Sequence, residues 1–422
     1  MPLRILLPAI GSSGDVNPVI GLGRALKARG HSVTVITNQL FCGQIRQAGL
    51  EFAQLGTREQ AEAMMRDPRL WTLRGGFQCI VEGALLPYLG PLYEMIRERS
   101  DASTVVAATT LCLGARVAQE KLGIRTATLN MQPTVFRSVV DGGWFGPIHL
   151  GPRTPRFAKQ AFYWFIDRAY VGRLVEPTFN AFRKTLGLPP VRDIFKTYFH
   201  SPQLVLGLFP NWFAPVQPDW PPNTHLTGFI LHDDGGEAGT DAEAEAFLAE
   251  GPPPLLVTPG SAAMDRHRFF AETIRACAGI GARAMLVTNH PAQLPGRLPA
   301  GIRAFAYLPF SRIFPRCAAV AYHGGVGTLA QTVRAGVPHL IIPNAHDQPD
   351  NARRIERLGL GVRVDPLRYK GIRAARALES ALHSDPIRRR CAEFAPQVDG
   401  NASLDRACTL IEGLAEADAV RS

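Results

Sequence analysis

Short runs of apolar residues alternate with helical patterns from the start of the chain. Residues 4–9 form an apolar run typical of a buried strand, a glycine-rich turn follows, and residues 18–29 have the pattern of a helix. Gly30 then ends this helix before a second apolar run at residues 32–37. This order predicts a strand, a helix and a parallel strand, which is the unit from which α/β sheets are built.

The same alternation continues through two halves of the chain. In the first half, the further predicted strands are residues 105–108, 126–130 and 204–208. Residues 209–239 are rich in Pro, Asn, Asp and Gly, which is the composition of a linker. In the second half, the predicted strands are residues 255–258, 284–288, 318–322 and 339–342. The pattern therefore predicts an α/β protein with two doubly wound, Rossmann-like domains that face a central cleft.

The length of 422 residues agrees with two domains of about 200 residues each. We expect an N-terminal domain at residues 1–228, a linker at 229–247 and a C-terminal domain at 248–393. Residues 394–422 should form a helical tail that returns to the N-terminal domain.

Composition narrows the class of protein. The seven cysteines are scattered and never form a C-x-x-C pair, so we expect neither a disulfide framework nor a thiolate metal site. The first apolar run is too short for a signal peptide and no run of about 18 apolar residues follows, so we expect a cytoplasmic protein without a membrane span. The net charge of +10 comes without a nucleic-acid motif, so nucleic acid is not an expected partner.

Residues 11–18, Gly-Ser-Ser-Gly-Asp-Val-Asn-Pro, connect the first predicted strand to the first helix, where open α/β sheets bind ligands. The glycines and the Ser13 hydroxyl could cradle a phosphate, and Asp15 could take a proton from a hydroxyl group or cap the helix. A dehydrogenase is a weaker interpretation, because the spacing is not G-x-G-x-x-G. In addition, the second strand ends in Thr37 and Asn38 without the carboxylate that an NAD site needs.

A second glycine-rich turn follows the predicted strand at residues 318–322. Here His323 precedes two glycines and a helix start, and backbone amides at a helix N-terminus bind anions. A lone histidine after a strand is usually structural, but the surrounding sequence favours a diphosphate site. The other residues expected to contribute to it are Gly325, Val326, Gly327, Thr328 and, from a third turn, Ser261.

Residues 343–351 are rich in amide and carboxylate side chains, which suit a polyhydroxylated sugar, although a polar loop with a helix cap would have the same composition. Asp347 and Gln348 are the candidates for sugar binding. The chain has no Asp-x-Asp pair and no His-x-x-x-His, so we expect no metal and no cofactor besides the sugar donor.

These motifs together resemble the family 1 glycosyltransferases of the GT-B architecture, over nearly the whole chain. The resemblance implies that Asp15 is the catalytic base, that residues 323–328 hold the donor diphosphate and that Asp347 and Gln348 bind the sugar. Tyr307 and Leu308 fall in the segment that packs against the nucleobase in that family. Tyr307 replaces a tryptophan there, and Phe310 replaces a polar residue, which leaves the donor base open.

Three further segments are similar to the rhamnosyltransferase B chain of rhamnolipid biosynthesis and to related flavonoid glycosyltransferases. These segments are residues 67–71, 200–203 and 208–215. The similarity implies an inverting transfer of rhamnose from dTDP-rhamnose to a hydroxyl group of a hydroxy-fatty-acid lipid or a flavonoid-like polyphenol. A UDP-glucose-dependent glucosyltransferase of sterols or other natural products, a GT-B-type epimerase and a nucleotide-binding protein without activity remain as alternatives.

The acceptor is expected on the N-terminal domain, against aromatic side chains that could equally be core. These side chains are Phe77, Phe136, Trp144, Phe145 and residues 162–165. Residues 153–173 mix basic and aromatic side chains and could touch the inner membrane, although a solvated helix is the commoner outcome. The oligomeric state, monomer or homodimer, is left open.

Overall fold

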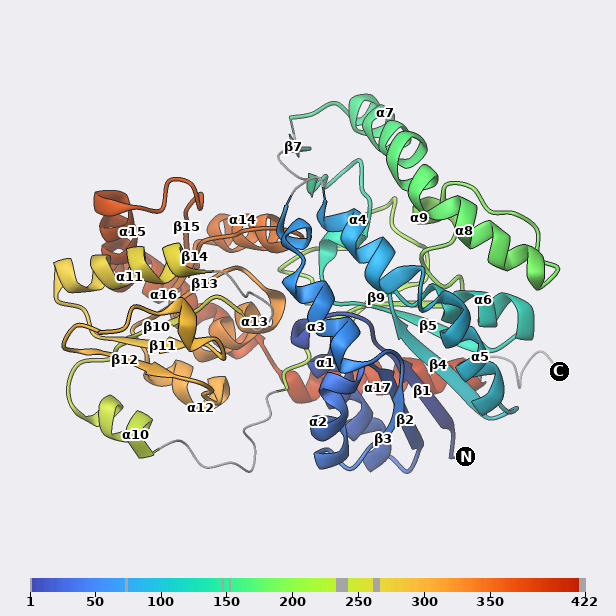
Figure 1. Ribbon diagram of the computed structural model, residues 1–422, viewed down its shortest axis with the longest axis horizontal. Helices are drawn as coiled ribbons and strands as arrows, with labels where there is room; N and C mark the ends of the chain where they lie inside the picture. The colour runs from blue at the N-terminus through green and yellow to red at the C-terminus, as the bar shows by residue number, and fades with distance from the viewer. Residues whose placement is uncertain are drawn as a thin grey trace. The chain divides into compact units, whose positions relative to one another are not determined.

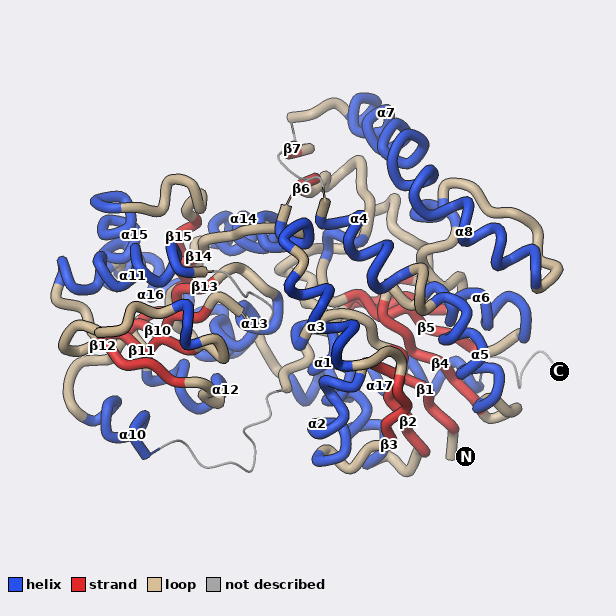
Figure 2. Tube along the Cα trace, in the orientation of Figure 1, coloured by secondary structure: helices blue, strands red, loops and turns tan. Residues whose placement is uncertain are grey.

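The computed structural model describes residues 2–72, 75–145, 148–151, 153–232, 242–260 and 266–416. These residues form two compact units, one of residues 1–230 with 400–422 and the other of residues 231–399. Each unit is built around one parallel sheet, and helices cover both faces of each sheet (Figures 1 and 2). The predicted α/β class with two Rossmann-like domains is therefore confirmed.

The first unit has a sheet of seven parallel strands in the order β3-β2-β1-β4-β5-β8-β9. The strands are β1 (Arg4–Pro8), β2 (Ser32–Thr37), β3 (Glu51–Gln54), β4 (Thr104–Thr109), β5 (Arg125–Asn130), β8 (Leu204–Gly207) and β9 (Thr224–Leu226). The order reverses between β1 and β4, so the turn after β1 lies at the switch point where such sheets bind ligands.

Helices of the first unit connect the strands and cover the sheet. They are α1 (Ser13–Ala28), α2 (Cys42–Gln47), α3 (Arg58–Arg66), α4 (Gly76–Ile80), α5 (Leu89–Arg99), α6 (Leu113–Leu122), α7 (Arg156–Ile166), α8 (Gly172–Thr185), α9 (Ile194–Thr197) and α17 (Gly400–Glu416). The short β6 (Trp144–Phe145) and β7 (Ile148–His149) pair with each other outside the main sheet. The first helix begins earlier than the predicted residue 18, because Ser12 and Asp15 form a capping box.

The second unit has six parallel strands in the order β12-β11-β10-β13-β14-β15. The strands are β10 (Leu255–Thr258), β11 (Ala284–Val287), β12 (Ile302–Phe305), β13 (Ala319–Tyr322), β14 (His339–Ile341) and β15 (Gly361–Arg363). The helices are α10 (Ala242–Ala249), α11 (His267–Ile280), α12 (Phe310–Ile313), α13 (Val326–Ala335), α14 (Gln348–Leu358), α15 (Gly371–His383) and α16 (Asp385–Phe394). α10 starts inside the segment that was expected to be a linker.

The C-terminal helix α17 packs on α1 of the first unit through charged contacts. Arg29, at the end of α1, donates to Glu412 at 2.6 Å and also pairs with Asp405. The Nε2 atom of His31 lies 2.8 Å from the same Glu412 carboxylate. Because the chain returns in this way, residues far apart in sequence share one unit.

Two further observations concern the cysteines and the apolar character of the helices. All seven cysteines are free of disulfide bonds. Within the described parts of the chain, every helix is too short or too polar to cross a membrane.

Candidate functional site

Asp15 lies in the first turn of α1 and caps it with one carboxylate oxygen. Its Oδ2 accepts hydrogen bonds from the Ser12 amide at 2.9 Å and from the Ser12 hydroxyl at 3.3 Å. Oδ1 has no hydrogen-bond partner within the described residues. The capping interpretation of Asp15 is therefore correct for Oδ2, and Oδ1 remains able to take a proton from a ligand.

The surroundings of Asp15 make it a stronger base than an ordinary aspartate. The side chain is half-buried, and its loss of water raises the pKa to about 6 although both Ser12 hydrogen bonds lower it. At pH 7 most of the carboxylate is still ionised. A general base works best when its pKa lies close to the operating pH, as it does here.

Gly11 makes room for this carboxylate. Its φ is +147°, and a Cβ at this position would lie 2.2 Å from Asp15 Oδ2. Any larger residue would push the base out of place. Gly11 is therefore needed for the position of Asp15, in addition to the approach of an anion that the sequence predicts.

Polar groups at the ends of β4 and β5 form the neighbouring part of this sheet edge. Thr109 Oγ1 accepts from the Ile10 amide at 3.2 Å. Thr110 donates to Asn130 Oδ1, and Asn130 Nδ2 lies 3.5 Å from His200 Nδ1. Burial lowers the pKa of His200 to about 4, so this imidazole is neutral at pH 7. These side chains hold one another, and Asp15 is the stronger candidate for the base.

Of the aromatic residues expected to face an acceptor, Phe77 and Phe136 pack in the interior of the first unit, whereas Trp164 and Phe165 are exposed on α7. Phe136 is buried and stacks on Trp220 with ring centroids 4.2 Å apart, which agrees with the core interpretation of this residue. Phe77 packs against the main core of this unit. The structure describes the backbone of Trp144 and Phe145 but not their side chains.

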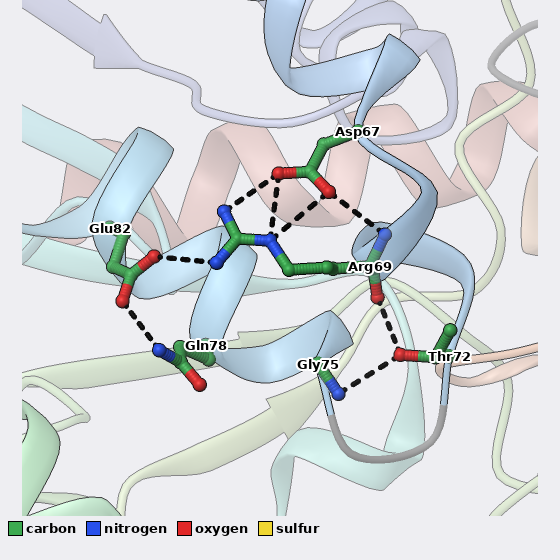
Figure 3. Close-up of polar contacts among 6 residues, drawn as sticks. All are labelled: Asp67, Arg69, Thr72, Gly75, Gln78 and Glu82. Atoms are coloured by element: carbon green, nitrogen blue, oxygen red, sulfur yellow. Dashed lines mark hydrogen bonds and ion pairs between the residues drawn. The ribbon is translucent and has the colours of Figure 1, made fainter.

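A polar network fixes the segment that follows α3 (Figure 3). The Arg69 guanidinium in the 3₁₀ turn Pro68–Trp71 donates to Asp67 at 2.7 Å and to Glu82 at 3.2 Å. The Thr72 hydroxyl donates to the Arg69 carbonyl at 2.9 Å and accepts from the Gly75 amide at 3.0 Å. Residues 67–71, quoted above for their resemblance, therefore shape the backbone of this segment through their own contacts.

In the second unit, two glycines enclose the ring of His323 before α13. A Cβ on Gly260 would lie 2.5 Å from His323 Cε1, and a Cβ on Gly325 would lie 2.4 Å from Nε2. Gly260 also has a φ of +90°, which favours glycine. The imidazole is thus held in one place by residues from two loops, after β10 and after β13.

His323 is neutral and has an unused polar atom. Burial, assisted by the positive charge of Arg266, lowers the pKa of His323 to about 3. Its Nδ1 is buried and has no hydrogen-bond partner among the described residues. An unpaired buried polar atom is unfavourable, so a ligand that hydrogen-bonds to it would gain binding energy. His323 can donate or accept one hydrogen bond, but it supplies no positive charge.

The positive charge at this place comes from other groups. A cavity of about 240 Å³ adjoins His323 within the second unit, and its lining consists of Pro259, Arg266, Arg268, Phe269, His323, Ile342, Pro366 and Tyr369. The first amide that donates inside α13 is that of Leu329, to Gly325 at 3.0 Å. The earlier amides of α13 lack acceptors within the helix, as at any helix N-terminus, and favour an anion.

Gln348 and Asp347, at the start of α14, have different roles. Gln348 is buried, and its Oε1 accepts from the Asn344 amide at 2.8 Å, as the helix-cap interpretation of this loop implies. Asp347 Oδ2 accepts from Asn351 Nδ2 at 2.6 Å, and this amide group also donates to the Gly324 carbonyl at 3.0 Å. Asn351 therefore connects Asp347 to the loop of His323 by hydrogen bonds. The sequence motif did not reveal this role of Asn351.

The remaining predicted donor residues differ in exposure. Tyr307 is 48% exposed, so its ring could pack against a nucleobase, whereas Leu308 is buried and could contact a ligand only through its backbone. Ser13 is half-buried at the first position of α1. Ser261 lies outside the described residues. The parts of the chain that the structure describes contain no group of three or more His, Cys, Asp or Glu able to hold a metal.

The sequence also matches models of known families. Residues 5–140 match the glycosyltransferase family 28 N-terminal domain, and residues 278–403 match the C-terminal domain of erythromycin biosynthesis protein CIII-like proteins. The O-mycaminosyltylonolide 6-deoxyallosyltransferase of Streptomyces fradiae is 30% identical over 98% of both chains. This chain belongs to the antibiotic glycosyltransferase family of GT-B fold. It is a glycosyltransferase that uses a nucleotide sugar.

Solved structures of GT-B glycosyltransferases share its fold. The glycosyltransferase of kitacinnamycin has a TM-score of 0.73 at 21% identity, with 98% of this chain and 99% of that chain covered. The spinosyn rhamnosyltransferase SpnG, complexed with thymidine diphosphate, has a TM-score of 0.66 at 18% identity, with 96% and 99% covered. The expected closeness to rhamnolipid and flavonoid enzymes stays a prediction.

Proposed function

We propose that this glycosyltransferase moves a rhamnosyl group from dTDP-rhamnose to a hydroxyl group of an apolar acceptor, with inversion at the anomeric carbon. The acceptor oxygen forms a bond to the anomeric carbon while the bond from that carbon to the diphosphate breaks. The acceptor proton goes to Asp15, and the nucleoside diphosphate leaves. No covalent intermediate with the protein is needed.

The state of Asp15 carries this proposal. One carboxylate oxygen is fixed by Ser12, the other has no partner in the described structure, and the pKa of about 6 leaves the group ionised at pH 7. Gly11 holds the carboxylate in place by steric contact. A fixed base with one free oxygen suits the abstraction of a proton from a neutral hydroxyl group.

The donor is assigned to the second unit. His323 would hydrogen-bond to a diphosphate oxygen, and the amides of Val326, Gly327 and Thr328 would stabilise the negative charge that grows on the leaving group. Arg266 and Arg268 line the same cavity as His323, and their guanidiniums would add charge.

The sugar end of the donor is assigned to the start of α14. The amide group of Gln348 and the carboxylate of Asp347 would hold sugar hydroxyls, while Tyr307 would pack against the nucleobase. The names of two similar proteins support a 6-deoxyhexose donor, since one transfers 6-deoxyallose and the other is a rhamnosyltransferase complexed with thymidine diphosphate. A hydroxy-fatty-acid lipid or a flavonoid-like polyphenol is the proposed acceptor.

We further propose that the reaction needs no metal ion. The electropositive groups around His323 would take the place of a divalent cation at the diphosphate. The enzyme would act in the cytoplasm as a monomer or homodimer, without nucleic acid.

A product assay tests the proposal. The purified enzyme is incubated with dTDP-rhamnose, dTDP-glucose or UDP-glucose, each with and without a hydroxy-fatty-acid lipid, a flavonol or a macrolide aglycone. Product mass identifies the sugar and acceptor. The one-bond carbon–proton coupling at the anomeric carbon identifies the configuration. If UDP-glucose were the one donor that gave a product, the proposed rhamnosyl donor would be refuted. Conversion of the nucleotide sugar to its epimer in the absence of acceptor would indicate an epimerase.

A further inference from the structure

Helix α7 exposes a large apolar surface on the first unit. Phe157, Trp164 and Phe165 are 75%, 62% and 59% exposed. Together with the exposed Ala161 they lie within roughly 100° of the helix circumference, so they form one continuous stripe, here named the α7 face. A continuous exposed apolar patch of this kind often marks an interaction site, whereas single exposed apolar side chains are common on any protein surface.

The opposite side of α7 attaches the helix to the rest of the unit. Lys159 is buried and donates from Nζ to the Val140 carbonyl at 3.2 Å, and the Tyr163 hydroxyl donates to the Ser138 carbonyl at 3.4 Å. α7 lies at the edge of the first unit, away from its sheet (Figure 1). The exposed aromatic residues are therefore not the outer part of the core, and their side chains point away from it.

The charge around the α7 face is positive. Four exposed arginines lie before, within and after the helix: Arg153, Arg156, Arg168 and Arg173. The one acidic residue between positions 153 and 173 is Asp167, which is buried and paired with Arg137. No exposed carboxylate in this stretch opposes the arginines.

We propose that the α7 face binds the surface of an anionic phospholipid bilayer. Aromatic side chains on one helix face enter the boundary between headgroups and acyl chains, while flanking arginines pair with lipid phosphates. A second copy of the chain fits less well, because a symmetric contact through this face would place arginines opposite arginines. The proposal does not depend on which sugar or acceptor the enzyme uses.

Vesicle sedimentation of the full-length enzyme tests this. Wild-type protein should bind vesicles of phosphatidylcholine mixed with phosphatidylglycerol. Its affinity should be about tenfold lower for vesicles of phosphatidylcholine alone, and about tenfold lower for the mixed vesicles at high salt. The variant Trp164→Ser/Phe165→Ser should lose binding to the mixed vesicles. The matched control Leu122→Ser/Val216→Ser, which removes two exposed apolar side chains elsewhere on the same unit, should bind like wild type.

Fluorescence adds a direct readout. The emission of Trp164 should shift to shorter wavelength on the mixed vesicles, and Trp164→Phe should remove the shift while binding persists. Unchanged circular dichroism and an unchanged melting temperature show that each variant is folded.

Three results would overturn the proposal. The first is that both double variants bind vesicles equally well. The second is that the wild type forms a dimer and Trp164→Ser/Phe165→Ser is a monomer. The third is that this variant has a raised KM for a water-soluble acceptor in the absence of lipid. The last two would assign the α7 face to self-association or to the acceptor.

Discussion

Replacing Asp15 by asparagine should inactivate the enzyme and also make it more stable at neutral and alkaline pH. Asparagine keeps an oxygen that can accept from the Ser12 amide, so the helix cap should survive. It cannot take a proton from the acceptor, so turnover should fall by about 10² or more while donor affinity changes little. In the wild type, kcat/KM should fall as pH drops below about 6, where the carboxylate becomes protonated.

The stability effect follows from the same pKa. Raising the pKa of Asp15 from 3.8 to about 6 corresponds to ~3 kcal/mol of unfavourable free energy for the ionised form in the folded protein. Because the folded state holds its proton more tightly, the wild type loses stability as pH rises from about 4 to about 6, whereas the asparagine variant does not. Between pH 5 and pH 8 the difference between the two proteins should grow by ~1.5 kcal/mol in favour of the variant.

Urea denaturation of both proteins at pH 5 and pH 8 measures this difference. The control is Asp101→Asn on the same unit, because hydrogen bonds from Ser103 and Thr104 lower the pKa of Asp101 and it stays ionised throughout this range. The Asp101 variant should therefore show no growing difference. Near-normal turnover of Asp15→Asn would return Asp15 to a capping role only. A stability difference independent of pH would mean that the raised pKa is wrong.

The remaining predictions concern the donor site. His323→Ala should weaken binding of the nucleoside diphosphate alone by ~1.5–3 kcal/mol, as calorimetry without acceptor would show, and unchanged affinity would require a different place for the diphosphate. Gly260→Ala should also weaken it, because its Cβ would displace His323, whereas Gly281→Ala, with a φ of +67° and open space around it, should cost stability only. Addition of a chelator should leave the initial rate unchanged, and a strict requirement for Mg²⁺ or Mn²⁺ in the chemical step would contradict the metal-free mechanism.

The central strands of both sheets could be predicted because they are buried on both faces and so appear as unbroken apolar runs. The strands that the apolar pattern did not reveal lie at or near the edges. β3 and β12 each expose two of their four residues, and β9 and β15 have three residues each, so none has a run long enough to stand out. The start of α1 was placed too late because Gly and Ser at residues 11–14 suggested a loop. The capping pair Ser12 and Asp15, three residues apart, was the local signal for the true start.

The motifs located the candidate site residues but not their contacts. Gln348 is expected to bind sugar, and the spacing did not reveal that its Oε1 also accepts from the backbone of its own loop. Asn351 links two loops that are separated by more than twenty residues, and its role depends on a tertiary contact with the Gly324 carbonyl that spacing cannot reveal. Arg266 affects the pKa of His323 although nearly sixty residues separate them. Such effects depend on which loops meet at the edge of a sheet, and a single sequence contains no record of that.

The glycines of both motifs point to one physical requirement. Gly11 is in contact with the side chain of Asp15, and Gly260 and Gly325 are in contact with that of His323, each at a distance that excludes a Cβ. In each unit, glycine therefore does more than let the backbone turn, because it allows one polar side chain to lie directly over the backbone and fixes it there. A side chain held by backbone loses little conformational entropy when a ligand binds, so the two groups assigned to proton transfer and to the leaving diphosphate are already in place before either substrate arrives.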